Sequence, residues 1–162
     1  MIRRPPRSTQ SRSSAASDVY KRQEMFWSQP NLLYASTHQM PLFPGTGAVS
    51  EVGEHNNVIN APLSAGSGSS EFRIAFNEII FPTLRKFSPD LLIVSAGFDA
   101  HADDPLANLN LYENDFSWIT LELLAIAEKY SDGRLVSVLE GGYNLEALSS
   151  SVSVHVRELM SV

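Results

Sequence analysis

The side chains best suited to chemistry lie in the stretch LLIVSAGFDAHADDP, residues 91–105. Four titratable groups follow its apolar run within six positions: Asp99, His101, Asp103 and Asp104. Carboxylate and imidazole groups bind metals and act as general acids and bases. Because sites in open α/β sheets form beyond the carboxyl ends of strands, this loop is a candidate site. The alternative is an acidic surface loop in which Asp104 and Pro105 open a turn.

A second candidate group, EGGYN at residues 140–144, follows another apolar run. Its two glycines allow the backbone to approach a ligand closely. Tyr143 is expected at the same carboxyl edge of the sheet as Asp99. A buried phenol that bonds a structural partner is the alternative interpretation of Tyr143.

Alternating strands and helices must position these groups. The apolar runs 91–94 and 134–139 predict buried strands, and residues 31–38 and 57–62 are strand-like. Apolar side chains at three- and four-residue spacing predict helices within residues 72–87, 116–130 and 145–159. Strand, loop, helix and strand in this order form a right-handed βαβ crossover. We therefore expect an α/β fold, a parallel sheet with helices on both faces.

Two details of these helices are open to test. Pro82 is expected to kink the first helix or to end it early. In the last helix we expect residues 149–151 on the outer side and His155 at the surface or half-buried. Neither His155 nor His55 is predicted to bind a metal.

Composition narrows the class of protein. The 162 residues suggest one domain, and no apolar run approaches the roughly 18 residues that span a membrane. Without cysteine, a zinc site must use His and carboxylate ligands. From residue 24 onward six basic side chains face seventeen acidic ones, a net charge of −11. Such a surface repels nucleic acid and attracts cationic substrates, such as an acetylated polyamine or a lysine-rich tail.

Residues 1–23 differ from the rest, with six basic side chains, one acid and no periodicity. A disordered arm or an organelle transit peptide is one interpretation. The segment also resembles a translated sequencing-library adapter fused to the reading frame, and we favour a non-native or disordered leader. The natural sequence is then expected to resume near Glu24, with residues 24–162 as one domain portion.

The strings SAGFDAH, DDPL and LEGGYNL resemble the zinc-dependent histone deacetylase and acetylpolyamine amidohydrolase family, in its class II-like bacterial branch. The resemblance implies that Asp99 is one of three zinc ligands and that the Tyr143 hydroxyl donates a hydrogen bond to the oxyanion. It also implies that Leu106 forms the floor of the substrate tunnel and that Gly142 lines it.

The segments THQ and FPGTG, at residues 37–39 and 43–47, resemble the part of the same family that supplies an aromatic tunnel wall, here Phe43. The resemblance further implies two structural monovalent-cation sites, with K⁺ as the expected ion. One lies around Ser36 and Thr37. The other is formed largely by backbone oxygens, near Phe26, Gln29 and Leu32.

The resemblance covers the carboxyl-terminal half of an arginase/deacetylase-like domain. The family's Asp-x-His zinc ligands and His-His general-base pair, which precede the segment beginning at Glu24, are absent from the sequence. The resemblance implies that the intact parent enzyme hydrolyses an acetyl-amide with Zn²⁺, and we expect that enzyme to be cytoplasmic. Because the upstream ligands and general base are absent here, we expect this chain by itself to bind zinc weakly and not to turn over.

Two other classes stay open. An arginase-type ureohydrolase would use paired manganese ions, and a single GFD loop followed by GGY fits it less well. A non-catalytic acyl-lysine-binding fragment is the other. The substrate is also open among an acetylated polyamine, an acetyl-lysine protein and a small acetylamide, and the sequence does not set the oligomeric state.

Overall fold

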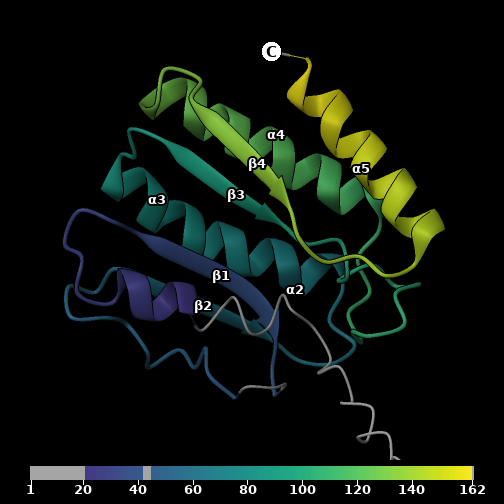
Figure 1. Ribbon diagram of the computed structural model, residues 1–162, viewed down its shortest axis with the longest axis horizontal. Coiled ribbons are helices and arrows are strands. Elements are labelled where there is room, and N and C mark those ends of the chain that lie inside the picture. The colour runs from purple at the N-terminus through teal and green to yellow at the C-terminus, as the bar shows by residue number, and fades with distance from the viewer. Residues whose placement is uncertain (1–20, 42–44, 162) are drawn as a thin grey trace, which may run out of the picture.

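The computed structural model describes residues 21–41 and 45–161 (Figure 1). Residues 21–26 are helical. The elements that follow are β1 Tyr34–Gln39, β2 Val58–Leu63, α2 Ser69–Ile74, the π-helix η1 Ala75–Ile80, α3 Phe81–Phe87, β3 Leu92–Ala96, α4 Glu113–Tyr130, β4 Leu135–Leu139 and α5 Leu145–Leu159. No helix in these described ranges is long and apolar enough to cross a membrane.

The strands form two parallel pairs. β1 pairs with β2 from Tyr34 opposite Val58 to Gln39 opposite Leu63. β3 pairs with β4 and ends where Ala96 lies opposite Leu139. In the described part of the chain no strand joins the two pairs. The predicted parallel crossover through α4 is confirmed, and it brings the loops after β3 and β4 to one edge.

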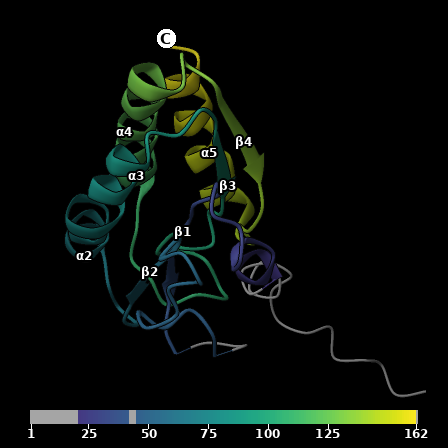
Figure 2. The ribbon, with the colours of Figure 1, turned by 90° about the vertical axis from the view of Figure 1, so that its left-hand side faces the viewer.

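The two faces of the β3–β4 pair differ sharply. Leu92 and Ala96 are buried in the core with α4, and α4 packs beside α5 (Figures 1 and 2). The alternate side chains face away, and Ile93 is 67% exposed and Val136 50% exposed. Because successive side chains of a strand point to opposite faces, the described helices cover one face of this pair only.

Pro82 does not end its helix. α2, η1 and α3 follow one another without interruption to Phe87. The Phe81 N–H bonds to the Phe76 carbonyl, one residue further back than in an α-helix. This wider turn gives the proline ring room in the first turn of α3. Of the two predicted outcomes, a kink or an early end, the early end is therefore wrong.

The outward orientation predicted for residues 149–151 is wrong for Ser151, which is fully buried. His155 is also buried, and its ring lies between Thr120 of α4 and Ser137 of β4. The prediction of a surface or half-buried histidine is therefore wrong as well. Its cause is that α5 buries small and polar side chains against α4, which hydrophobic periodicity does not detect.

Candidate active site

Asp99 lies in the loop after β3, against two glycines. A Cβ atom on Gly141 would lie 2.6 Å from Asp99 Cγ, and one on Gly97 would lie 3.0 Å from Asp99 Oδ1. The Phe98 N–H donates to the Gly141 carbonyl at 2.8 Å, which ties the two loops together. Gly141, one of the two glycines predicted to allow close approach, therefore receives the Asp99 carboxylate together with Gly97.

Electrostatics favour a cation beside this carboxylate. Burial raises the pKa of Asp99 above its ordinary value, and the negative charges of Asp104 and Glu140 add to the rise. Its own backbone N–H opposes the shift by hydrogen bonding. A half-buried carboxylate with negative neighbours is stabilised by a metal ion, as a zinc ligand would be.

The chemistry of Asp99 fits zinc, but it is a single donor. Among the described residues no group of three or more His, Cys, Asp or Glu side chains is placed to hold a metal ion. Catalytic zinc sites use three protein ligands. Asp99 therefore contributes one ligand to any such site.

Tyr143 follows β4 at the edge that holds Asp99, because Gly141 contacts Asp99 and Ala96 lies opposite Leu139. The Tyr143 residue is 39% exposed, which excludes the buried-phenol interpretation. Gly142 precedes it with φ 139°, and a Cβ there would lie 2.7 Å from Leu148 Cδ1. Only glycine fits at this position, so the backbone at Gly142 fixes the position of Tyr143 in the loop after β4.

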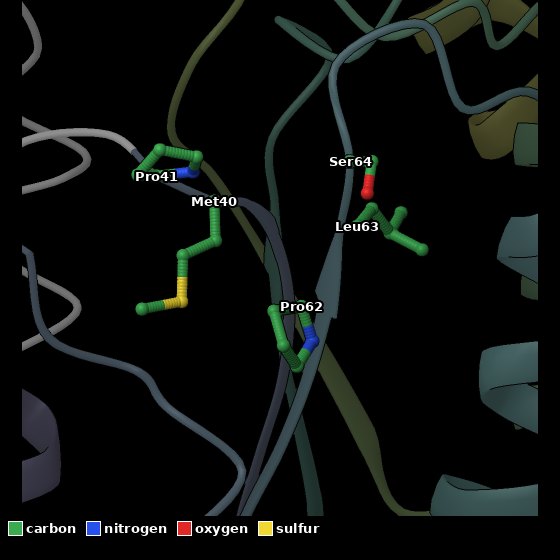
Figure 3. Close-up of a pocket in the computed structure, with 5 residues that line it drawn as sticks. All are labelled: Met40, Pro41, Pro62, Leu63 and Ser64. Atoms are coloured by element: carbon green, nitrogen blue, oxygen red, sulfur yellow. The ribbon is translucent and has the colours of Figure 1, made fainter.

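Leu106 is 45% exposed in the loop after Asp104, as a residue that contacts a ligand can be. Phe43 lies outside the described residues. At the carboxyl ends of β1 and β2, an open hollow of about 350 Å³ is lined by Met40, Pro41, Pro62, Leu63 and Ser64 (Figure 3). Its lining includes neither Asp99 nor Tyr143.

The carbonyl groups predicted to form the second cation site do converge. Asn57 Nδ2 donates to the carbonyl oxygens of Phe26 at 2.7 Å, Gln29 at 3.1 Å and Leu32 at 3.1 Å. The oxygens suit a monovalent cation, but the amide nitrogen lies at their meeting point. A cation there would have to displace it.

At the first predicted cation site, Ser36 and Thr37 lie in β1 opposite Asn60 and Ala61 of β2. The Ser36 Oγ lies 3.2 Å from His38 Nδ1. Both residues of the prediction are thus adjacent on one strand, and further oxygen ligands would have to come from other segments.

Comparison with known proteins agrees with the site described above. The histone deacetylase domain profile matches residues 22–159. The chain belongs to the histone deacetylase family. A rice protein named histone deacetylase 10, chloroplastic, is 44% identical over 133 residues, which cover 80% of this chain and 30% of that protein. A probable deacetylase of Archaeoglobus fulgidus is 42% identical over 127 residues, covering 76% of this chain and 35% of that protein.

Solved deacetylases have the same fold. The HDA15 HD domain superposes with a TM-score of 0.79 at 35% identity, covering 86% of this chain and 40% of that one. The histone deacetylase Clr3 gives a TM-score of 0.78 at 34% identity, covering 86% and 24%. The predicted arginase/deacetylase-like fold is confirmed. This family member spans about a third of the length of the two relatives above.

Three features of the edge formed by the loops after β3 and β4 were not predicted from the sequence. Arg22 pairs with Glu140 and donates to Ser95 Oγ at 2.7 Å, and this pairing lowers the pKa of Glu140. Asp104 is 7% exposed and accepts two backbone N–H groups. The motif spacing marks the acidic loop but does not say which carboxylate faces inward.

His101 is the third feature. It is 3% exposed and its ring stacks on Phe116. The ring is therefore buried beneath the loop and is not part of its exposed surface. Its Nδ1 accepts the Asp103 N–H at 3.1 Å, so the ring anchors the loop in the core.

Proposed function

We propose that this chain carries the carboxyl-terminal part of the active site of a zinc-dependent deacetylase. The proposed reaction is hydrolysis of the acetyl-amide of acetyl-lysine or of an acetylated polyamine. The observation that carries the proposal is the meeting of Asp99 and Tyr143 at one edge, where Gly141 receives the Asp99 carboxylate and Tyr143 is exposed two residues later.

Amide hydrolysis needs an activated water, a polarised carbonyl and a donor where the oxyanion develops. When bound, zinc supplies the Lewis acid and lowers the pKa of water. Asp99 is the residue of this chain that would hold it. The Tyr143 hydroxyl donates a hydrogen bond to the oxyanion, while Leu106, Gly142 and Phe43 shape the tunnel for the acyl chain.

We further propose that the chain by itself binds zinc weakly and does not turn over. It offers Asp99 as one ligand, and three are needed. The uncovered face of β3–β4 supports this proposal, because parallel sheets normally bury both faces. Ile93 and Val136 on that face would pack against the remainder of the domain, which would also bring the Asp-x-His and His-His residues.

Reconstitution tests the proposal. The chain is co-expressed with the segment of the Archaeoglobus fulgidus relative that precedes its matched region, loaded with Zn²⁺, and assayed on an acetyl-lysine peptide and on N-acetylputrescine. We expect hydrolysis from the pair and none from either part. Zinc-dependent hydrolysis by the chain alone would overturn the proposed dependence on a second part.

Tyr143→Phe removes one hydroxyl and should lower turnover of the reconstituted enzyme about 100-fold to 1000-fold, as the loss of an oxyanion donor does. Tyr130→Phe is the matched control. Tyr130 is the last residue of α4 and lies near the amino-terminal end of β4, whereas Tyr143 follows the carboxyl-terminal end of that strand. Equal turnover in the two variants would refute the role of Tyr143.

A non-catalytic acyl-lysine-binding fragment is the second candidate. It is favoured by the lack of a three-ligand metal cluster among the described residues. Calorimetric titration of the chain with an acetyl-lysine peptide and its unacetylated form separates the two. Selective binding that persists in Asp99→Asn, together with an inactive reconstituted pair, would favour the binding fragment.

A further inference from the structure

We propose that Asp104 is a positioning residue for the reaction: its buried carboxylate fixes the backbone of Tyr143 and of Leu106 at the same time. The inference rests on the proposed function for the roles of those two residues. The contacts themselves do not depend on it.

The two carboxylate oxygens of Asp104 have different partners. Oδ2 accepts the Tyr143 N–H at 2.7 Å, and Oδ1 accepts the Leu106 N–H at 2.9 Å. Hydrogen bonds to an ionised acceptor are short and about twice as strong as neutral ones. One side chain thus joins the loop after β3 to the loop after β4, across 39 residues of sequence.

Asp104 is itself held from the core. Its N–H donates to the His101 carbonyl at 2.9 Å, and His101 is buried against Phe116. Asn144, which caps α5, donates from Nδ2 to the Asp103 carbonyl at 3.0 Å. The loop is therefore supported on both sides of Asp104, and such support is what keeps a reacting group in place.

The geometry requires a carboxylate. Both N–H groups point at acceptor oxygens, and an asparagine would offer one oxygen and one NH₂ group. Asp104→Asn keeps the size but sets a donor against a donor at either Tyr143 or Leu106. The adjacent Asp103 is the matched control, since its side chain is 73% exposed and none of the described hydrogen bonds uses its carboxylate.

Amide hydrogen exchange on the full 162-residue chain tests the contact without activity. In Asp104→Asn we expect the Tyr143 or Leu106 amide to exchange at least about 10-fold faster and its NMR resonance to move upfield. The core amides of Ile126 and Ala127 should not change, and Asp103→Asn should leave all four unchanged. An unaltered Tyr143 and Leu106, or equal acceleration throughout the chain, would overturn the proposal.

The unmodified chain keeps the test decisive if Asp104→Asn does not fold. In the unmodified chain the Tyr143 and Leu106 amides should exchange much more slowly than the Asp103 amide. The described hydrogen bonds of the Asp103 N–H include only the one to the His101 ring. Exchange of Tyr143 and Leu106 at the rate of an unstructured peptide would refute the contact.

The reconstituted enzyme tests the positioning role. If Asp104 acts through Tyr143, Asp104→Asn should lower kcat about 10-fold to 100-fold in the wild-type background and much less in Tyr143→Phe, because the two residues act as a unit. Additive losses would overturn the role. An inactive pair would refute the proposed function but leave the exchange result readable, so the two failures are distinguishable.

Discussion

The loops around β1–β2 and the loops after β3–β4 are held by side chains of opposite character. Asn57 is a neutral amide that donates to three carbonyl oxygens. Asp104 is a carboxylate that accepts two backbone N–H groups. In the first arrangement a neutral side chain provides the hydrogen bonds that the carbonyl oxygens accept. The second adds negative charge beside Asp99, where it helps to raise the pKa of that carboxyl.

This contrast indicates where each half would accept a cation. At the β1–β2 loops a donor already fills the point of convergence, so an ion competes with a hydrogen-bonding group. At the β3–β4 edge the neighbouring carboxylates disfavour one another, so an ion relieves a repulsion. Metal binding should therefore stabilise the second region more than the first.

Of the changes that test this contrast, Gly141→Ala should have the largest effect. The new Cβ would lie 2.6 Å from Asp99 Cγ and must displace the carboxylate. A shift of about 1 Å at a reacting centre can lower the reaction rate about 100-fold. We expect a loss of this size in the turnover of the reconstituted enzyme. Gly66→Ala is the control, because it strains a positive φ of 85° but has open space around its Cβ. Equal losses in the two variants would mean that the Asp99 contact has no specific effect on turnover.

Asn57→Ala breaks the other arrangement. Three carbonyl oxygens lose their common donor, and the free energy of unfolding should fall by about 1–3 kcal/mol in urea titrations. Asn77→Ala, at an exposed helical position, should change it little. Repeating the titrations in K⁺ and in choline tests the cation prediction. A K⁺-dependent gain confined to Asn57→Ala would show that the amide and the ion compete for one place.

Much of the fold was predictable because it follows local periodicity. The strand expected at 134–139 is observed at Leu135–Leu139, and the helix expected within 116–130 is α4. Asp99 and Tyr143 fell at one edge because parallel strands joined by a crossover end together. The continuation of the helix past Pro82 was not predictable, since the π turn that accommodates the proline leaves no signal in the spacing of apolar residues.

The supporting contacts were not predictable for a physical reason. Asn57 bonds to carbonyls 25 to 31 residues away, and backbone groups carry no sequence signature. The same holds for Asp104 and the Tyr143 N–H. Asp103 and Asp104 are identical in type, and nothing in their sequence distinguishes the buried Asp104 from Asp103, whose side chain is 73% exposed.

The buried His155 is a polar group without charge that lies between α4 and β4. Thr120 Oγ1 donates to the Phe116 carbonyl, so it accepts from His155 Nδ1 at 2.7 Å, and Nε2 accepts from Ser137 at 2.8 Å. Burial lowers the pKa of this neutral ring below its ordinary value of 6.5. As the pH falls through about 6.5, the unfolded chain takes up a proton that the folded chain does not.

The free energy of unfolding should therefore decrease below about pH 6.5, by at most about 1.4 kcal/mol per pH unit, until the lowered folded-state pKa is reached. His155→Gln should reduce this slope, and His38, whose pKa is also lowered by burial, should account for part of what remains. His55→Gln, at an exposed position, should leave the slope as it is. Urea titrations between pH 7 and pH 5 measure the effect. An unreduced slope in His155→Gln would assign the effect to other groups.

Ile93→Ser should have the smallest effect on the isolated chain. Ile93 is 67% exposed on the uncovered face of β3, so its replacement should change the free energy of unfolding by less than about 0.5 kcal/mol. Leu92→Ser, one residue earlier and 7% exposed, is the matched change on the covered face and should destabilise the chain severely. If the uncovered face packs against a second part of the domain, Ile93→Ser should nevertheless weaken reconstitution. Unchanged assembly and activity of that variant would place the docking surface elsewhere on the molecule.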